Sequence, residues 1–430
     1  MHIRTIRFTV IPTVLAAWLV LMAGIVRSEE SALSSEDIRK LVHQGVTLFE
    51  QGKYKEAAGA LEKALAQKPD SDLILEFVEQ NGYHLFYRML TKPAGEGADD
   101  LTKVARRLLD AAQTGHIRRI TDKEAIDKVL TDLFANDFDR QMVSMMRLEV
   151  NIGQNAMPQL LPLLGDAKED LKRIRAIEAL NRIRDDAVLP LIEGCNSKNE
   201  FMTRNAAIVL GNLRDGRAVP ALKRLWENPA ADPLTRESAA TALQKITGLP
   251  PDKLPPPTEL YYQLAERYFY EDPSVMVPYH DKAFILWVWN ADKGELSSIV
   301  VPACLYNEKL AEEACYDSIT LAPGQEPVKS LLCAVYLAQW DEIRDRIEVA
   351  RAGKEKGVVP EGELEDLTKL ADRLKSLESI VYSSGEERLF ATLARALKDR
   401  DVAIAVSAIR FISHLSSGNL LPAAAGSVQK

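Results

Sequence analysis

The chain has 430 residues, a formal net charge of −8, 47% hydrophobic residues and 27% charged residues. The apolar content excludes a disordered chain, and the acidic balance argues against a general nucleic-acid-binding protein, which is usually basic. A chain of this length holds about two to four ordinary domains or one long repeat array.

The N-terminus is basic, with Arg4 and Arg7, and a largely apolar run follows over residues 8–26. This order predicts an export signal or a single membrane anchor over residues 1–28, and it leaves both open. Val26 and Ser28 would suit cleavage after Ser28. Because the basic residues precede the run, we expect the rest of the chain in the periplasm, in the cell envelope or outside the cell. The membrane is a partner only if the segment is retained.

A pair of helices and a following helix are predicted over residues 36–92. Gly45 and Ala57 are small enough for the two helices to approach closely, Gly52 allows the reversal, and Pro69 ends the second helix. The pattern as a whole consists of Leu41, Gly45, Leu48, Gly52, Tyr54, Ala57, Leu61, Ala64 and Pro69. It resembles one tetratricopeptide repeat, which implies stacking on a neighbouring helix.

A second kind of repeat is predicted over residues 99–248. Three groups of residues recur every 30 to 33 positions: Pro158, Pro190 and Pro220; Leu180, Leu210 and Leu243; Ile183, Leu213 and Ile246. The pattern over about residues 135–248 resembles HEAT-like repeats of the short variety found in phycobilisome-lyase relatives. That resemblance implies stacked helix pairs with a proline early in each first helix.

Enzymes occur among the HEAT-like families, and the metal-binding hydroxylases among them use His-Glu pairs on successive helices. The histidines of this chain are scattered, and none is followed by glutamate; they include His43, His84, His116, His280 and His414. We therefore expect no catalytic set, no metal and no cofactor. A lyase-like cofactor-binding protein or enzyme remains the alternative, although bilin lyases are intracellular and fit an export segment poorly.

Arginines gather along the HEAT-like repeats, among them Arg182, Arg184, Arg214 and Arg217. They would line a concave face for an anionic partner, or they would pair with neighbouring aspartates as a ladder between repeats. The sequence leaves both interpretations open.

The proline-rich stretch over residues 249–257 predicts an extended linker and a domain boundary. Beyond it, residues 258–345 resemble a tetratricopeptide unit that is split by an insertion over about residues 271–302. Within the insertion, AFILWVWN and ELSSIVVP flank ADKG, which predicts a β-hairpin.

Trp287 and Trp289 would share one face of the first strand of this hairpin. Together with Tyr279 of the same insertion they are candidate anchors for a partner protein. The alternative is that the tryptophans cover the end of the HEAT-like array or pack on Tyr261 and Tyr268.

Residues 346–430 are predicted to form a charged helical segment and further HEAT-like repeats, and NLLPAAAGSVQK resembles half of one more repeat. An incomplete repeat suggests either a truncated chain or an open end that stacks against a partner or self-associates with another copy. The four cysteines form no Cys-x-x-Cys and are expected to be buried; a Cys315–Cys333 disulfide stays open.

The sequence therefore predicts an all-α helical-hairpin repeat solenoid, with TPR-like and HEAT-like units and a small β-hairpin insertion. It resembles secreted or membrane-anchored bacterial HEAT-repeat proteins. The expected function is a non-catalytic scaffold that binds other proteins, and not nucleic acid, outside the cytoplasm. A self-assembling envelope component is a further alternative.

Overall fold

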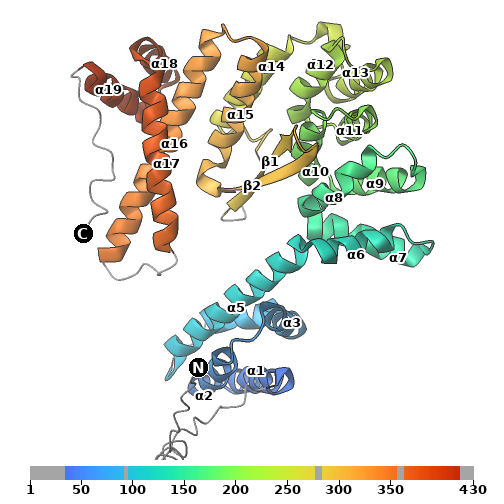
Figure 1. Cartoon of the computed structure of the whole chain (residues 1–430). Helices are drawn as coiled ribbons and strands as arrows, with labels where there is room; N and C mark the ends of the chain where they lie inside the picture. The colour runs from blue at the N-terminus through green and yellow to red at the C-terminus, as the bar shows by residue number, and fades with distance from the viewer. Residues whose placement is uncertain (1–33, 92–94, 277–282, 356–362, 417–430) are drawn as a thin grey trace, which may run out of the picture. The chain divides into compact units, whose positions relative to one another are not determined.

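The computed structural model describes residues 34–91, 95–276, 283–355 and 363–416 (Figure 1). The predicted export segment, Tyr279 and the incomplete last repeat lie outside the described residues. The described chain is almost entirely helical and contains one two-stranded sheet, which confirms the predicted fold class. It divides into two units, residues 1–122 and residues 123–430.

The first unit consists of α1 (Ser35–Glu50), α2 (Tyr54–Ala66), α3 (Ser71–Asn81), α4 (Tyr83–Thr91) and α5 (Ala98–Thr121). The α1–α2 pair approaches closely at Gly45, where an added Cβ would lie 2.6 Å from Cγ of Leu61. Leu101 and Leu108 of α5 are buried in the same core as α1 and α2. This unit therefore extends to Asp122, and the boundary predicted at residue 99 falls inside it.

The HEAT-like array begins the second unit. It consists of α6 (Lys123–Leu133), α7 (Phe138–Arg147), η1 (Leu148–Ile152), η2 (Gly153–Ala156), α8 (Met157–Leu164), α9 (Asp170–Ile183), α10 (Asp185–Gly194), α11 (Glu200–Leu213), η3 (Gly216–Ala218), α12 (Val219–Glu227) and α13 (Pro233–Thr247). The recurring Leu180, Leu210 and Leu243 of the second helices are fully buried. The repeat pattern thus marks the core of the array.

The prolines of the first helices do not all lie at equivalent positions. Pro158 and Pro220 lie in the first turns of α8 and α12, as predicted, where a missing amide leaves no hydrogen bond unmade. Pro190 lies in the interior of α10, because that helix begins at Asp185, directly after the turn. The prediction of an early proline is therefore wrong for this repeat.

The Arg-Asp pairs lie at helix ends. Arg184 and Arg214 each end a second helix with a φ of +58°. Arg400, followed by Asp401, ends α18 (Glu386–Asp399) with a φ of +61°. Arg214 and Arg400 are both left-handed, with ψ of 35° and 29°, whereas Arg184 has a ψ of −120°, so the three positions share a positive φ but not one turn geometry.

The proline-rich linker does not separate the packing of its two sides. It contains η4 (Pro251–Lys253), and the buried Lys223 of α12 donates a hydrogen bond of 2.8 Å from Nζ to the Pro251 carbonyl. The next helix, α14 (Pro257–Phe269), packs against α12. The predicted domain boundary at residues 249–257 is therefore an internal connection of the second unit.

The split helix pair and its inserted hairpin are present. Helix α14 packs against α15 (Tyr306–Leu321), and Ser318 Oγ donates a hydrogen bond of 2.8 Å to the Thr258 carbonyl. Between them lie β1 (Ala283–Asn290), β2 (Glu295–Pro302) and η5 (Ala303–Leu305). The strands pair antiparallel, with Asn290 opposite Glu295.

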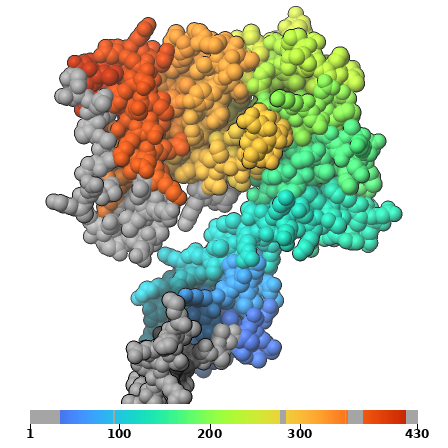
Figure 2. Space-filling view, in the orientation of Figure 1, coloured from blue at the N-terminus to red at the C-terminus, as the bar shows by residue number. Residues whose placement is uncertain are grey.

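The hairpin lies between two hydrophobic cores, because its apolar side chains alternate between its faces. Ile285, Trp287 and Trp289 pack against the core of the HEAT-like array. Phe284 and Leu286 pack against the core formed by α14 and the helices that follow. Figure 2 shows the hairpin, in yellow, between the green array and the orange helices.

The chain continues with α16 (Glu326–Glu355), α17 (Glu363–Ser384), α18 and α19 (Val402–Ser416). Their buried apolar residues join α14 and α15 in one core. In the described residues, all four cysteines are free, so Cys315 and Cys333 form no disulfide. None of the described helices is long and apolar enough to span a membrane, and the apolar run over residues 8–26 lies outside the described residues.

Candidate functional site

Trp287 covers the HEAT-like array. Its side chain is 6% exposed, and its indole Nε1 donates a hydrogen bond of 2.9 Å to Gln154 Oε1 on η2. Trp289 is partly buried against the same core. Trp287 is therefore not available as an exposed anchor, and its position follows the alternative interpretation of the two tryptophans.

Glu193 connects the β1 edge of the hairpin to α10. Its Oε2 accepts a hydrogen bond of 2.8 Å from the Trp289 amide. Burial raises the pKa of Glu193 to about 7, and the Trp289 amide opposes this shift; Asp317 nearby raises the pKa further, while Arg224 lowers it. A titratable carboxyl thus holds the hairpin and the array together.

The structure does not place the four predicted arginines on one open face. Arg217 is 5% exposed, and its guanidinium donates a bidentate pair of hydrogen bonds to the Asp215 carboxylate. The shorter of the two is 2.8 Å, from Nη2 to Oδ2. Arg182 lies 3.6 Å from Glu149 of η1. The predicted pairing with acidic residues thus describes these two arginines.

Arg184 and Arg214 are exposed at the two helix ends. Another ion pair between repeats is formed by Arg204 of α11, whose Nη2 lies 2.7 Å from Asp232 Oδ2 before α13. Arg184 and Arg214 keep their place as candidate contacts for a partner.

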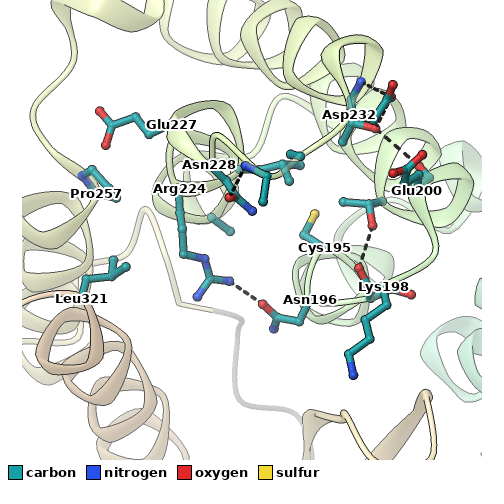
Figure 3. Close-up of a pocket in the computed structure, with 17 residues that line it drawn as sticks. Cys195, Asn196, Lys198, Glu200, Arg224, Glu227, Asn228, Asp232, Pro257 and Leu321 are labelled. Carbon is teal, nitrogen blue, oxygen red and sulfur yellow. Dashed lines mark hydrogen bonds between the residues drawn. The ribbon is translucent and has the colours of Figure 1, made fainter.

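A cavity of about 700 Å³ lies where the HEAT-like array meets α14 and α15 (Figure 3). The loops after α10 and α12 form much of its wall, with Pro257 and Leu321 opposite. Arg224 of α12 reaches across this junction, donating a hydrogen bond of 3.1 Å to Asp317 Oδ1 and another to Asn196 Oδ1. The arginine therefore ties three parts of the second unit together.

The chemistry of this cavity is that of a structural junction. Burial raises the pKa of the Cys195 thiol to about 12, which leaves it protonated and a poor nucleophile at neutral pH. Asp232 and Thr203 are already hydrogen-bonded to neighbouring residues. No histidine is among the residues that line the cavity, so Cys195 has no imidazole base beside it.

Several exposed apolar side chains of the array lie on α7, η1 and α9. Phe138, Met142 and Met146 are 71%, 40% and 56% exposed, and their four-residue spacing places them on one stripe of α7. Helix α7 and helix α9 both contact η1, and we call the exposed apolar residues of these three elements the outer apolar face: Phe138, Met142, Met146, Val150, Leu171 and Ile174. Its last three members, on η1 and α9, are 72%, 60% and 51% exposed.

The outer apolar face is not among the predicted sites, because the α7 segment precedes the three regular repeats and does not share their recurring residues. The signal was present in QMVSMM, where apolar residues occupy two sides of one short helix. Met145 is 6% exposed and faces the core, whereas the side chains of Met142 and Met146 are exposed to solvent. A helix with apolar residues on both sides needs a second surface to cover it.

In the part of the chain that the structure describes, no group of three or more histidine, cysteine, aspartate or glutamate side chains is arranged to hold a metal ion. The sequence contains no histidine between His116 and His280, the region that includes the whole HEAT-like pattern. A His-Glu ligand set therefore has no counterpart in that region.

Two comparisons bear on the array. Residues 157–244 match the family of HEAT repeats. Deoxyhypusine hydroxylase-B of Oryza sativa subsp. japonica is 32% identical over 85 residues, which covers 20% of this chain and 28% of that protein. The chain thus spans little more than a quarter of that relative. Residues 157–244 are similar to HEAT repeats, and they belong to an all-α repeat solenoid that carries a small β-hairpin.

Proposed function

We propose that this protein is a non-catalytic scaffold that binds other proteins through its helical repeats. The outer apolar face is the observation that carries the proposal. Large exposed apolar patches mark interaction sites, and flexible methionines adapt to a partner's surface. The expected ligand is an apolar segment or amphipathic helix of a partner protein, laid against α7 and α9. HEAT repeats commonly serve such interactions.

The test places a photo-cross-linking amino acid at Met146 in the outer apolar face. The matched control carries it at Val349 of α16, an apolar position that is 73% exposed. We expect a discrete protein adduct from position 146 that is absent from position 349. A Met142→Asp, Leu171→Asp double variant should reduce the adduct about tenfold, because charge on the face must be desolvated on binding.

A different result would contradict the scaffold function. Equal adducts from both positions would indicate non-specific cross-linking. Turnover of a substrate at a defined site would make the protein an enzyme. Circular dichroism and the unfolding midpoint of the double variant must match those of the wild type, since both changes are at exposed positions.

The proposal also includes export, which is supported by the basic start and the apolar run over residues 8–26. A fusion of alkaline phosphatase to residue 430 should be active in cells and inactive when residues 8–26 are deleted. Activity that survives the deletion would contradict export by this segment. N-terminal sequencing of the mature protein separates a cleaved signal from a retained anchor.

The resemblance to deoxyhypusine hydroxylase-B over 85 residues favours a second candidate, a cofactor-binding protein or enzyme of the HEAT-like kind. The absence of histidine between His116 and His280 counts against a His-Glu site in the array. Elemental analysis of the purified full chain decides this candidate: bound metal near one equivalent would favour it, and a metal-free, colourless preparation would count against it.

A further inference from the structure

The outer edge of β2 is open along part of its length. The Trp289 amide donates to Glu193 and so points away from β2, which makes Trp289 and its partner Leu296 a pair without mutual hydrogen bonds. Such pairs alternate along an antiparallel ladder. The amides of Ser298 and Val300 therefore also point away from β1.

Helices α8 and α10 contact β2, but in the described part of the chain they leave backbone groups of this edge unpaired. No described residue accepts a hydrogen bond from the amide of Ser298 or Val300. The side chains of Ile299 and Val300 are 52% and 72% exposed. Open strand edges are usually protected by charge or proline, and here a proline, Pro302, is reached only at the end of β2.

A basic cavity of about 930 Å³ adjoins this edge. Val300 and Pro302 form its wall on the hairpin side, and α17 contributes Leu370 and Leu377 on another. The charged side chains that line it are four cations and one carboxylate: Lys309, Arg346, Lys369, Arg373 and Glu312. The lining is therefore strongly positive, although the chain as a whole is acidic.

The one carboxylate is already neutralised. Glu312 Oε2 accepts hydrogen bonds of 2.6 Å from Lys309 Nζ and 2.8 Å from Gln339 Nε2. Gln339 Oε1 in turn accepts a hydrogen bond of 2.7 Å from Arg373 Nη2, while the buried Nε of Arg373 has no partner among the described residues. Outside the lining, Glu342 of α16 lies near Arg346. Lys369 has an interaction of its own, but Arg373 is bonded to a neutral amide, so the lining keeps more cations than carboxylates.

We propose that the open edge of β2 and the basic cavity form one docking site for an extended acidic segment of another protein. The segment adds as a third strand, and its backbone carbonyls accept hydrogen bonds from the Ser298 and Val300 amides. Alternate side chains of an added strand point to the same side. Glutamates or aspartates on that side meet the cations of α16 and α17. This site is separate from the outer apolar face and does not depend on it.

The probe is a fluorescein-labelled peptide of about eight residues in which valine and glutamate alternate. Its binding to the purified full chain is measured by fluorescence anisotropy. Two control peptides separate the two parts of the site: one has lysine in place of glutamate, and one has N-methylated backbone amides on its pairing edge. We expect the acidic peptide to bind at least about tenfold more tightly than either control.

Two variants test the residues. Val300→Pro removes an amide that points away from β1, so the β1–β2 ladder keeps its hydrogen bonds, and affinity should fall about tenfold. Lys369→Glu should weaken binding by a similar factor and reduce its salt dependence. Lys375→Glu, on the same helix and outside the cavity, is the matched control and should change affinity less than about twofold.

Several outcomes would overturn the proposal. The lysine peptide could bind as tightly as the acidic one, or both variants could leave affinity unchanged. If the chain forms a dimer that Val300→Pro dissociates and that the acidic peptide does not disrupt, the edge is occupied by a second copy instead. Should Val300→Pro fail to fold, the N-methylated peptide still decides, because equal binding of both acidic peptides would exclude strand addition.

Discussion

Glu193 is the residue whose chemistry is most changed by its place in the fold. Its carboxyl faces the Trp289 amide at the contact between α10 and the hairpin, and burial raises its pKa from 4.5 to about 7. In the folded chain the carboxyl therefore holds its proton more tightly than in the unfolded chain. Its stabilising contribution is complete below pH 4.5, is lost as the pH rises to about 7, and stays lost above that value.

Glu193→Gln should therefore make unfolding less dependent on pH. The amide oxygen still accepts the Trp289 hydrogen bond, but glutamine, unlike the carboxyl, has no proton to release when the chain unfolds. Between pH 5 and pH 8 the free energy of unfolding of the wild type should fall by about 2–3 kcal/mol more than that of the variant. Urea unfolding followed by circular dichroism at both pH values measures this difference.

Glu308 offers an independent comparison, because burial also raises its pKa to about 7. A Glu308→Gln change should reduce the pH dependence further, and the two effects should add if the sites are independent. Parallel curves for the wild type and Glu193→Gln would show that Glu193 is ionised in the folded chain at pH 5, and the assignment of this residue would be wrong.

The sequence shows which residue types are present, but it does not show which residues surround each of them in the fold. The arginines of the array are recognisable, yet Arg217 is withdrawn into a pair with Asp215, and Arg184 remains exposed. Whether an arginine is paired or exposed depends on where the neighbouring helices end, and the whole fold determines those positions. Glu193 gave no signal, since a single glutamate in an apolar helix usually points to solvent.

Among the elements, the hairpin connects the two hydrophobic cores of the second unit. Trp287→Ala should lower the free energy of unfolding by about 3–5 kcal/mol, since it leaves a large cavity against the HEAT-like array and removes the bond to Gln154. Denaturant unfolding measures the loss. Ile299→Ala on β2, where the side chain is 52% exposed, is the control and should cost less than about 1 kcal/mol.

A small loss for Trp287→Ala would mean that the hairpin rests loosely on the array. In that case the tryptophan would regain its place among the candidate contacts for a partner. A variant with phenylalanine at this position separates packing from the hydrogen bond, because the ring fills most of the space but cannot donate to Gln154.

The sequence predicted the hairpin itself correctly, with both strands and the turn, because alternation and ADKG are local signals. It could not decide what the two strand faces cover. Alternating apolar residues such as Leu286 and Trp287 indicate burial on both sides, but the neighbours come from residues more than a hundred positions away, as the Gln154 bond shows. The domain boundary predicted at residues 249–257 is wrong for a similar reason, because the contact of Lys223 with Pro251 is tertiary.

For the whole molecule, separate cores in residues 38–112 and residues 126–412 predict two unfolding events. Scanning calorimetry of the full chain should show two transitions. Trp287→Ala should lower only the midpoint of the second unit, and Leu61→Ala, at a fully buried position of the first unit, only that of the other. One transition that both changes shift equally would indicate a single cooperative unit.

The hairpin also has a mechanical consequence. In an ordinary solenoid each repeat touches only its neighbours, so the array stretches and bends like a spring. Here a hydrogen bond and a buried indole connect residues 133 positions apart, Gln154 and Trp287. Tension applied across the second unit must shear the hairpin from the array before the helices between them can separate. We expect a single large rupture under load where an open spring would yield gradually.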